Sequence, residues 1–127
     1  MKAIHTPEVP EAIGPYSQGV VSNGFFFTHG VLPLDKDTGL VVGETIEEQA
    51  EQVLKNLMAL VRAGGSDEFH IVKTNVFITD MKKFAAFNAV YAKYFQREFP
   101  ARACVEVTAL AKGALVEIEA IAEVCRE

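Results

Sequence analysis

The chain has 127 residues, half of them hydrophobic, and carries a formal net charge of −5. This length fits a single domain with one core, spanning residues 1–127. Its apolar runs are much shorter than the roughly 20 residues of a membrane-spanning helix, so we expect no membrane insertion. The first residues lack the apolar stretch of a secretion signal, and the two cysteines provide no disulfide framework. We therefore expect a cytoplasmic protein.

The charge balance argues against nucleic-acid binding. Twelve Lys and Arg residues face seventeen Asp and Glu residues and are scattered among them. Proteins that bind nucleic acids gain most of their affinity from basic side chains that neutralise phosphates, and no basic stripe is visible here. No Cys/His spacing matches a zinc site, so we also expect no metal.

The first third of the chain predicts a β-hairpin after a proline-rich loop. Residues 2–5 can form a short strand before the prolines interrupt regular structure. Two strands, at 18–22 and 25–31, flank Asn23-Gly24, a dipeptide typical of two-residue hairpin turns. A connection with a turn at 35–39 follows.

The middle of the chain predicts two helices and a strand between them. Thr45 and Glu48 have the spacing of a capping box, and an apolar stripe with helical period follows until Gly64-Gly65. Residues 70–79 have the composition of a strand. Asp80 then caps a second helix, expected to run to about residue 98.

Two alternating segments, 101–107 and 115–124, predict the last strands. Arg102 follows a proline at the start of the first, where a rigid guanidinium suits a carboxylate or phosphate. The alternative is that Arg102 forms a salt bridge on the surface. The short connection permits the two strands to pair, which would place Arg102 and Glu117 on the same side of one sheet. A cation that can bind an anion and a carboxylate that can transfer a proton would then lie close together.

This element order predicts an α+β fold. The order β-β-α-β-α-β-β, with the short N-terminal strand added, gives a mixed six-stranded sheet with both helices packed on one face. The other face would bear Arg102, Glu117 and Glu119 together with apolar residues. Because such a face is a liability for a monomer, we expect a closed homo-oligomer in which sheet faces sheet.

Five segments in order resemble one protein family. They are residues 12–19 (AIGPYSQG), 71–77 (IVKTNVF), 87–91 (FNAVY), 100–102 (PAR) and 116–122 (VEIEAIA). The chain is similar to the reactive intermediate deaminases, the RidA, YjgF or L-PSP endoribonuclease-like family. The resemblance implies a chorismate-mutase-like fold and a homotrimer with sites between subunits. It also implies hydrolysis of reactive enamines and imines, of the 2-aminoacrylate and 2-aminocrotonate type, to 2-keto acids and ammonia, without a cofactor.

The resemblance assigns roles to four residues. Arg102 corresponds to the carboxylate-binding arginine of the family and Glu117 to its water-associated glutamate. Tyr16 corresponds to the pocket tyrosine and Gly30 to the strand glycine. In the implied reaction Arg102 orients an imino acid by its carboxylate while Glu117 positions the attacking water.

Four other residues are considered separately. His29 and Val31 stand where the family commonly has Ser and Gln, and His29 is either a structural histidine or a pocket residue that alters substrate preference. We expect Cys104 to line the pocket through its backbone, as a small hydrophobic residue rather than a nucleophile. Asn88 interrupts a helical apolar stripe and is expected to be a buried residue that hydrogen-bonds the helix to a loop.

Two alternative functions stay open from the sequence. One is cleavage of single-stranded RNA, as the older family name says, although the chain lacks a basic-aromatic groove. The other is a non-catalytic role as a trimer that binds a small carboxylate or acts as a chaperone, which Arg102 would serve equally well.

Overall fold

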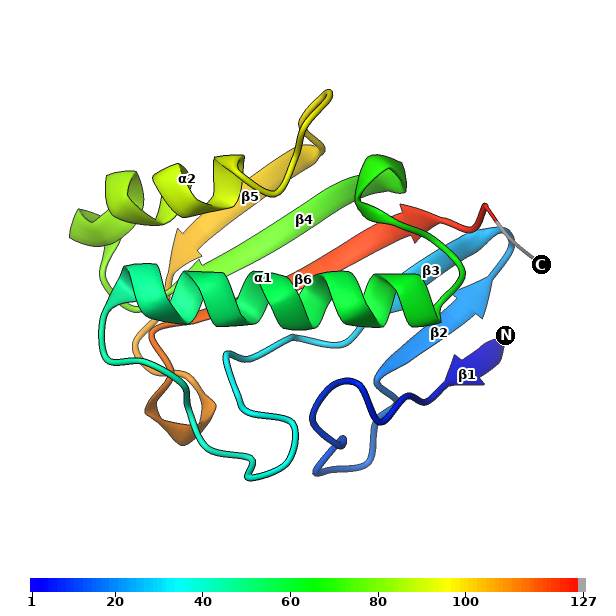
Figure 1. Cartoon of the computed structure of the whole chain (residues 1–127), viewed down its shortest axis with the longest axis horizontal. Helices are drawn as coiled ribbons and strands as arrows, with labels where there is room; N and C mark the ends of the chain where they lie inside the picture. The colour runs from blue at the N-terminus through cyan, green and yellow to red at the C-terminus, as the bar shows by residue number, and fades with distance from the viewer. Residues whose placement is uncertain (126–127) are drawn as a thin grey trace.

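Residues 1–125 of the computed structural model form a six-stranded mixed sheet with two α-helices on one face (Figure 1). The strands are β1 (Lys2–Ile4), β2 (Gly19–Ser22), β3 (Phe25–Thr28), β4 (Ile71–Ile78), β5 (Ala101–Glu106) and β6 (Val116–Glu123). The helices are α1 (Ile46–Ala63) and α2 (Phe84–Ala92), and the 3₁₀ turns are η1 (Glu68–His70), η2 (Met81–Lys83) and η3 (Ala111–Gly113). The predicted α+β class, with both helices on one face, is confirmed.

The order of the strands contradicts the predicted pairing of the last two. The sheet runs β1-β2-β3-β6-β4-β5, so β6 lies between β3 and β4 while β5 is an edge strand parallel to β4. Strand β5 follows β4 through helix α2, and such a strand–helix–strand crossover favours parallel neighbours. Every second residue of β6 is buried, as in a central strand. An edge position would leave these residues less well covered.

The register places Arg102 and Glu117 on opposite faces of the sheet. Arg102 lies beside Thr74 on β4, and Glu117 lies beside Phe77 on the same strand. Partners in register project to the same face, and residues three apart on one strand project to opposite faces. The expectation that both side chains project from one face is therefore wrong: Arg102 faces the helices and Glu117 faces the open side.

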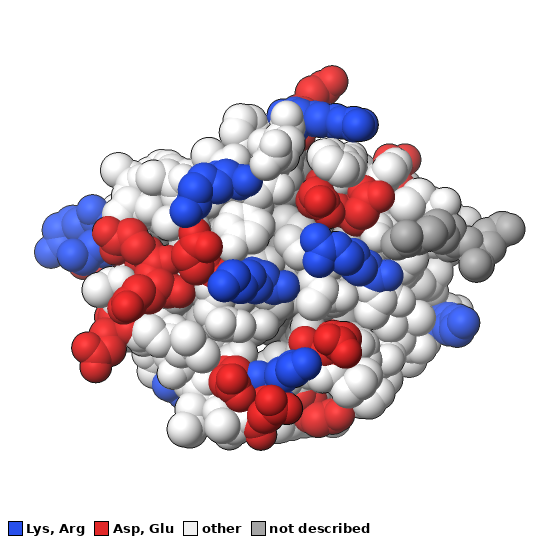
Figure 2. Space-filling view, in the orientation of Figure 1, with Lys and Arg blue, Asp and Glu red and all other residues white. Residues whose placement is uncertain are grey.

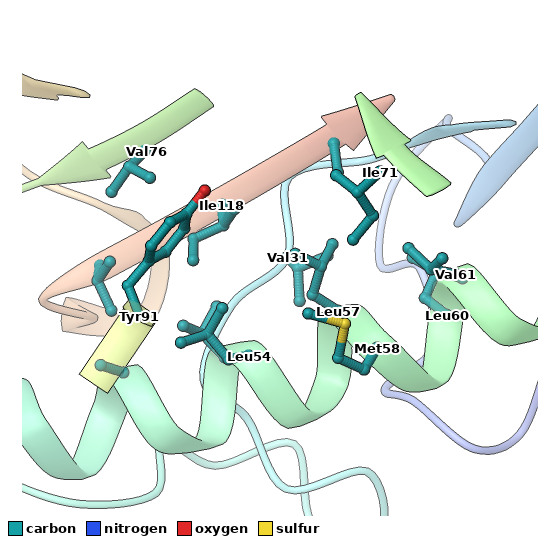
Figure 3. Close-up of a cluster of buried hydrophobic side chains, with 14 of the residues drawn as sticks. Val31, Leu54, Leu57, Met58, Leu60, Val61, Ile71, Val76, Tyr91 and Ile118 are labelled. Atoms are coloured by element: carbon teal, nitrogen blue, oxygen red, sulfur yellow. The ribbon is translucent and has the colours of Figure 1, made fainter. Parts of the chain in front are cut away.

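Helix α1 covers the centre of the sheet. Thr45 and Glu48 form the predicted capping box, with the Glu48 amide donating to Thr45 Oγ1 at 3.2 Å. At the other end, a Cβ atom on Gly64 would lie 2.5 Å from the Phe26 ring, so only glycine lets the helix end contact β3 this closely. Figure 3 shows the apolar side chains of α1 packed against those of the sheet, which include Val31, Ile71, Val76 and Ile118.

The second helix is shorter than predicted. Asp80 accepts a hydrogen bond from the Lys82 amide, but the first turn is the 3₁₀ turn η2, and α2 ends at Ala92 instead of continuing to residue 98. The aromatic stripe nevertheless continues beyond the helix, because the rings of Tyr91 and Phe95 lie 4.7 Å apart. The chain after α2 is therefore ordered by this ring packing together with turn hydrogen bonds, in which the amides of Lys93, Tyr94 and Phe95 donate to the carbonyls three residues before them.

Strand β3 ends at Thr28, before the predicted boundary at residue 31. Phe27 pairs with Ile121 but Val31 bridges Ile118, so the chain from 27 to 31 carries one residue more than its partner. Thr28 Oγ1 accepts a hydrogen bond from the Ala120 amide at 2.9 Å, which replaces a ladder bond at this irregularity. An extra residue of this kind bends a strand and redirects its side chains.

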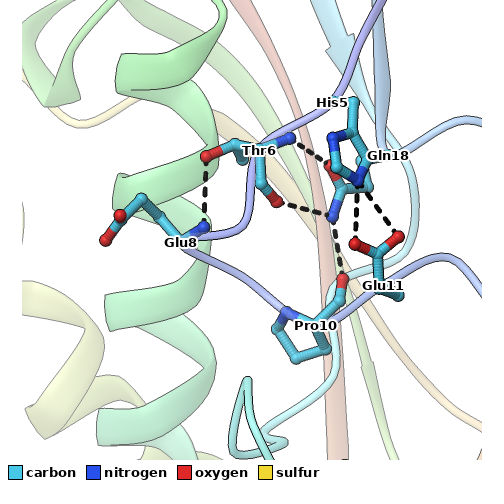
Figure 4. A network of polar contacts seen from close by, with 6 residues as sticks. All are labelled: His5, Thr6, Glu8, Pro10, Glu11 and Gln18. Carbon is cyan, nitrogen blue, oxygen red and sulfur yellow. Dashed lines mark hydrogen bonds and ion pairs between the residues drawn. The ribbon is translucent and has the colours of Figure 1, made fainter.

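The loop before β2 is anchored by one buried glutamine. Gln18 is 2 % exposed; its Oε1 accepts from the Thr6 amide at 2.7 Å, and its Nε2 donates to the carbonyls of Thr6 and Pro10 (Figure 4). In the same view, His5 and Glu11 form an exposed pair at 2.8 Å. Gln18 thus fixes the entry and exit of the segment that carries Tyr16.

The face of the sheet opposite the helices carries apolar side chains that the chain itself leaves exposed. Phe25, Phe27 and Val105 are 36 %, 38 % and 48 % exposed, while Phe26 between the first two is fully buried. Within residues 1–125, no helix has the length and apolar character required to cross a membrane.

Replacing the buried glutamine tests the importance of this anchor. We expect Gln18→Ala to lower the free energy of unfolding by about 2–3 kcal/mol, because three buried backbone groups lose their partner. His5→Ala, in the same network but exposed, should change it by less than about 0.5 kcal/mol. Urea unfolding at one fixed protein concentration measures both, and equal effects would contradict the role given to Gln18.

Candidate functional site

Arg102 is held over two aromatic rings on the helix side of β5. Its guanidinium carbon lies 4.8 Å from the ring centroid of Tyr91 and 5.3 Å from that of Phe84. Tyr91 is itself fixed, because its hydroxyl and Thr74 Oγ1 lie 2.7 Å apart within the core. Contacts of this kind stabilise a cation and orient it. We call Phe84, Asn88, Tyr91, Arg102 and Cys104 the Arg102 cluster.

The guanidinium of Arg102 is available to an anion. No carboxylate among residues 1–125 lies within ion-pair distance of it, which contradicts the alternative of a surface salt bridge. A cavity of about 300 Å³ adjoins it, lined by Asn88, Tyr91, Ala92, Phe99, Pro100 and Arg102. A planar, permanently charged donor beside a cavity of this size can bind a small carboxylate through two parallel hydrogen bonds.

Asn88 lines this cavity and carries an unsatisfied polar atom. Its Oδ1 is buried and has no hydrogen-bond partner in the described part of the chain. This oxygen therefore does not accept the hydrogen bond between helix and loop that was expected of Asn88. Since buried polar atoms are normally paired, Asn88 is a candidate ligand-binding residue that the sequence interpretation treated as structural. The signal was present: a polar residue within an apolar helical stripe.

Cys104 lies two residues after Arg102 on the same face of β5 and is half-buried. Burial raises the pKa of its thiol, and the nearby Arg102 charge only partly opposes this effect. A raised pKa keeps the thiol protonated, whereas a nucleophilic cysteine requires the thiolate. Partial burial of the thiol therefore favours the expected non-nucleophilic role.

Glu117 lies on the open face in close contact with Gly30. A Cβ atom on residue 30 would lie 2.7 Å from the carboxyl carbon of Glu117 and 2.8 Å from its Oε2, so only glycine admits the carboxylate in this position. The extra residue between Phe27 and Val31 brings the backbone of Gly30 to this point. We call Tyr16, His29, Gly30 and Glu117 the Glu117 cluster.

The environment of Glu117 disfavours its charged form. Burial raises the pKa of this carboxyl, and the neighbouring Glu119 charge raises it further. Glu119 accepts a hydrogen bond from Asn75 Nδ2 at 3.0 Å, which holds it on the same face. A carboxylate with a raised pKa is a better proton acceptor than an exposed one.

Tyr16 and His29 complete this cluster. Their rings are stacked with centroids 5.6 Å apart, and the Tyr16 hydroxyl accepts a hydrogen bond from the Ile13 amide at 3.2 Å. Burial lowers the pKa of His29, so its imidazole is neutral at pH 7 and has one donor and one acceptor nitrogen. Val31, the other departure from the family pattern, is buried in the core and pairs with the backbone of Ile118.

The structure therefore divides the six predicted site residues into two groups. Arg102 and Cys104 lie on the helix side of edge strand β5; Tyr16, His29, Gly30 and Glu117 gather at the junction of β3 with β6. A cavity lined by Tyr16, His29 and Gly30, but not by Glu117, shares no lining residue with the cavity beside Arg102. One chain thus presents a cation for an anionic group and, separately, a carboxylate for proton transfer.

Comparison with known proteins identifies the family. The model of the endoribonuclease L-PSP family matches residues 6–124. The chain belongs to this family, which includes proteins named RutC and RidA. The resemblance found in the five sequence segments is thereby confirmed.

Relatives of known name or structure cover nearly the whole chain. The mouse 2-iminobutanoate/2-iminopropanoate deaminase is 45% identical over 121 residues, which are 95% of this chain and 90% of the mouse protein. The crystal structure of RidA from an Antarctic Psychrobacter species has a TM-score of 0.93 and 39% identity, covering 98% of this chain and 100% of that one. That of Escherichia coli TdcF with bound serine has a TM-score of 0.92 and 41% identity, covering 97% and 98%.

Charges on the helix side show no single-sign field. Figure 2 shows Lys and Arg side chains interspersed with Asp and Glu over this face. Several of these are in ion pairs, such as Lys93 with Glu51 at 2.7 Å and Arg62 with Glu68 at 3.6 Å. A surface of this kind lacks the stripe of free cations that usually follows a phosphate backbone.

The raised pKa of Glu117 predicts how stability depends on pH. The folded chain binds more protons at this site than the unfolded chain between the ordinary carboxyl value of 4.5 and the raised value, so stability falls as pH rises through that window. Glu117→Gln removes the charge. We expect this variant to be more stable than the wild type at pH 7, with the difference disappearing below pH 4.5.

Thermal unfolding across this pH range measures the effect. Glu123→Gln is the matched control, since Glu123 lies on the same strand and face but is exposed, and it should give no comparable gain. A Glu117→Gln variant that is no more stable than the wild type at pH 7 would contradict the assigned environment.

Proposed function

We propose that this protein hydrolyses reactive imino acids, the tautomers of enamines such as 2-aminoacrylate and 2-aminocrotonate, to 2-keto acids and ammonia. Arg102 carries this proposal: it is oriented by two rings, adjoins a cavity and has no carboxylate partner in residues 1–125. The relative named as a 2-iminobutanoate/2-iminopropanoate deaminase and the TdcF structure with bound serine support a small amino-acid-like ligand.

The Arg102 cluster binds and orients the substrate. The guanidinium holds the carboxylate by two N–H···O bonds and thereby fixes the adjacent imine carbon. The side chain of Asn88, which lines the same cavity, supplies a polar group on the side of the imine nitrogen in this arrangement. Cys104 follows two residues further on the same face of β5 but does not line this cavity in the single chain.

The Glu117 cluster supplies the water and moves its protons. The water oxygen bonds to the imine carbon while the carbon–nitrogen π pair moves to nitrogen, and Glu117 transfers the first proton of the water to that nitrogen. Transfer of the second proton by the same carboxylate releases ammonia and leaves the carbonyl of the keto acid. The raised pKa of Glu117 suits this role, and Tyr16 and His29 enclose the pocket.

The site is completed between subunits of a homotrimer. The two clusters lie on opposite faces of one sheet, so they can meet only if the Arg102 cluster of one subunit approaches the Glu117 cluster of the next. The exposed Phe25, Phe27 and Val105 give the open face the apolar character of a surface covered by other copies of the chain. A cytoplasmic location stays a prediction.

Removing the guanidinium tests the assigned substrate contact. In an assay coupled to a serine or threonine dehydratase, we expect Arg102→Ala to reduce keto-acid release to the uncatalysed rate while assembly and thermal stability are retained. Arg102→Lys should recover only part of the activity, because an ammonium cannot form the two parallel bonds. Full activity of Arg102→Ala would refute the proposal. RNA cleavage that depends on Arg102, without keto-acid release, would instead support the ribonuclease alternative.

Mixing two inactive variants tests the shared site. Arg102→Ala damages the part of the site that one subunit supplies, and Glu117→Gln damages the part that the next subunit supplies. In every mixed trimer, one of the three sites combines an intact Arg102 with an intact Glu117. After equal amounts are unfolded together and reassembled, about a quarter of all sites should be restored. Each variant reassembled alone is the control. If the site lay within one subunit, the mixture would stay as inactive as its components.

A further inference from the structure

A second group of reactive side chains lies away from both clusters. Asp67, His70 and Cys125 each offer one ligand atom, and a carboxylate oxygen, an imidazole nitrogen and the thiol sulfur all lie within 4.8 Å of one another. None of these residues belongs to the Arg102 or the Glu117 cluster. The geometry points to a binding site for a divalent transition metal such as Zn²⁺, and this inference does not depend on the proposed function.

Backbone contacts hold the three ligands in place. Asp67 caps η1, its Oδ1 accepting from the Phe69 amide at 2.9 Å, and the Asp67 carbonyl accepts from the His70 amide at 3.1 Å. The Cys125 amide donates to the Gly65 carbonyl at 3.0 Å, which fixes the segment after β6 beside the loop after α1. A site whose ligands are already positioned loses little freedom when the ion binds.

The side-chain contacts show that the donor atoms converge. Asp67 Oδ1 lies 2.6 Å from His70 Nδ1, and its Oδ2 lies 3.9 Å from Cys125 Sγ. The sulfur also lies 3.4 Å from the Gly65 carbonyl oxygen. The carboxylate thus lies between the imidazole and the thiol, and a bound cation would replace these short polar contacts with bonds to itself.

The donor set selects the class of metal. A thiolate, an imidazole and a carboxylate suit Zn²⁺ and Co²⁺, whereas Mg²⁺ and Ca²⁺ prefer oxygen donors alone. The thiolate and the carboxylate together offset the charge of a divalent ion. His70 and Asp67 are 42% and 30% exposed, so solvent can fill a fourth, tetrahedral position.

The proposed site differs from the sequence-based expectation of no metal. That expectation used the closely spaced Cys and His pairs typical of zinc sites. Here Asp67 and His70 precede β4 and Cys125 follows β6, and the start of β4 lies beside the end of β6, with Ile71 paired to Ala122. The antiparallel pairing of β4 with β6 brings these distant segments together.

Titration with Co²⁺ tests the site in the full-length chain freed of metal by a chelator. We expect one Co²⁺ per chain, with the near-ultraviolet charge-transfer band of a cobalt–thiolate bond and visible bands of tetrahedral strength. Cys125→Ser should abolish the charge-transfer band. His70→Ala should weaken binding by more than about tenfold, because the ion loses a protein ligand.

Two matched variants control for other binding. Cys104→Ser removes the other thiol, and His5→Ala removes a histidine that also pairs with an exposed carboxylate. Both should bind Co²⁺ like the wild type. Absence of the band from the wild type, its persistence in Cys125→Ser, or its loss in Cys104→Ser would overturn the assignment.

Thermal unfolding gives a readout that is independent of the spectrum. Zn²⁺ should raise the melting temperature of the wild type progressively with concentration, because it binds the folded chain, and should not raise that of Cys125→Ser. The melting temperatures of both proteins in chelator establish whether the variant is folded. An equal Zn²⁺ effect on both proteins would also overturn the assignment.

Discussion

The insertion of β6 between β3 and β4 is the constraint on which the candidate site depends. As a central strand, β6 must bury Val116, Ile118, Ala120 and Ala122 beneath the helices, and its alternation then forces Glu117 and Glu119 onto the open face. Strand β5 is left at the edge, where Arg102 faces α2. The separation of cation and carboxylate is thus a consequence of core packing, and the proposed shared site follows from it.

Local packing gives each cluster its chemical character. Tyr91, fixed by Thr74, supplies a ring that orients Arg102 without neutralising it. Partial burial and the neighbouring Glu119 charge raise the pKa of Glu117, while burial lowers that of His29. These oriented and partly buried polar groups are the observations on which the proposed binding site rests.

Local signals predicted most of the elements. The capping box at Thr45, the Asn23-Gly24 turn and the two strands that alternate around Arg102 and Glu117 depend on residues near in sequence, and all were found. The predictions failed where packing between residues far apart in the sequence determines the ends of an element. Strand β3 ends at Thr28 because its partner has one residue fewer, and α2 ends at Ala92 while ring packing continues the aromatic stripe. Neither cause is visible within a short window of sequence.

The sequence by itself determined the α+β class, the family and the residue types available for chemistry, because periodicity and ordered motifs are properties of the chain. Only the tertiary structure decided which residues meet. It separated Arg102 from Glu117, added Asn88 to the Arg102 cluster and brought Cys125 to Asp67 and His70. The physical reason is that the order and register of strands follow from burying apolar faces across the whole sheet, and residues far apart in the chain contribute to that burial together.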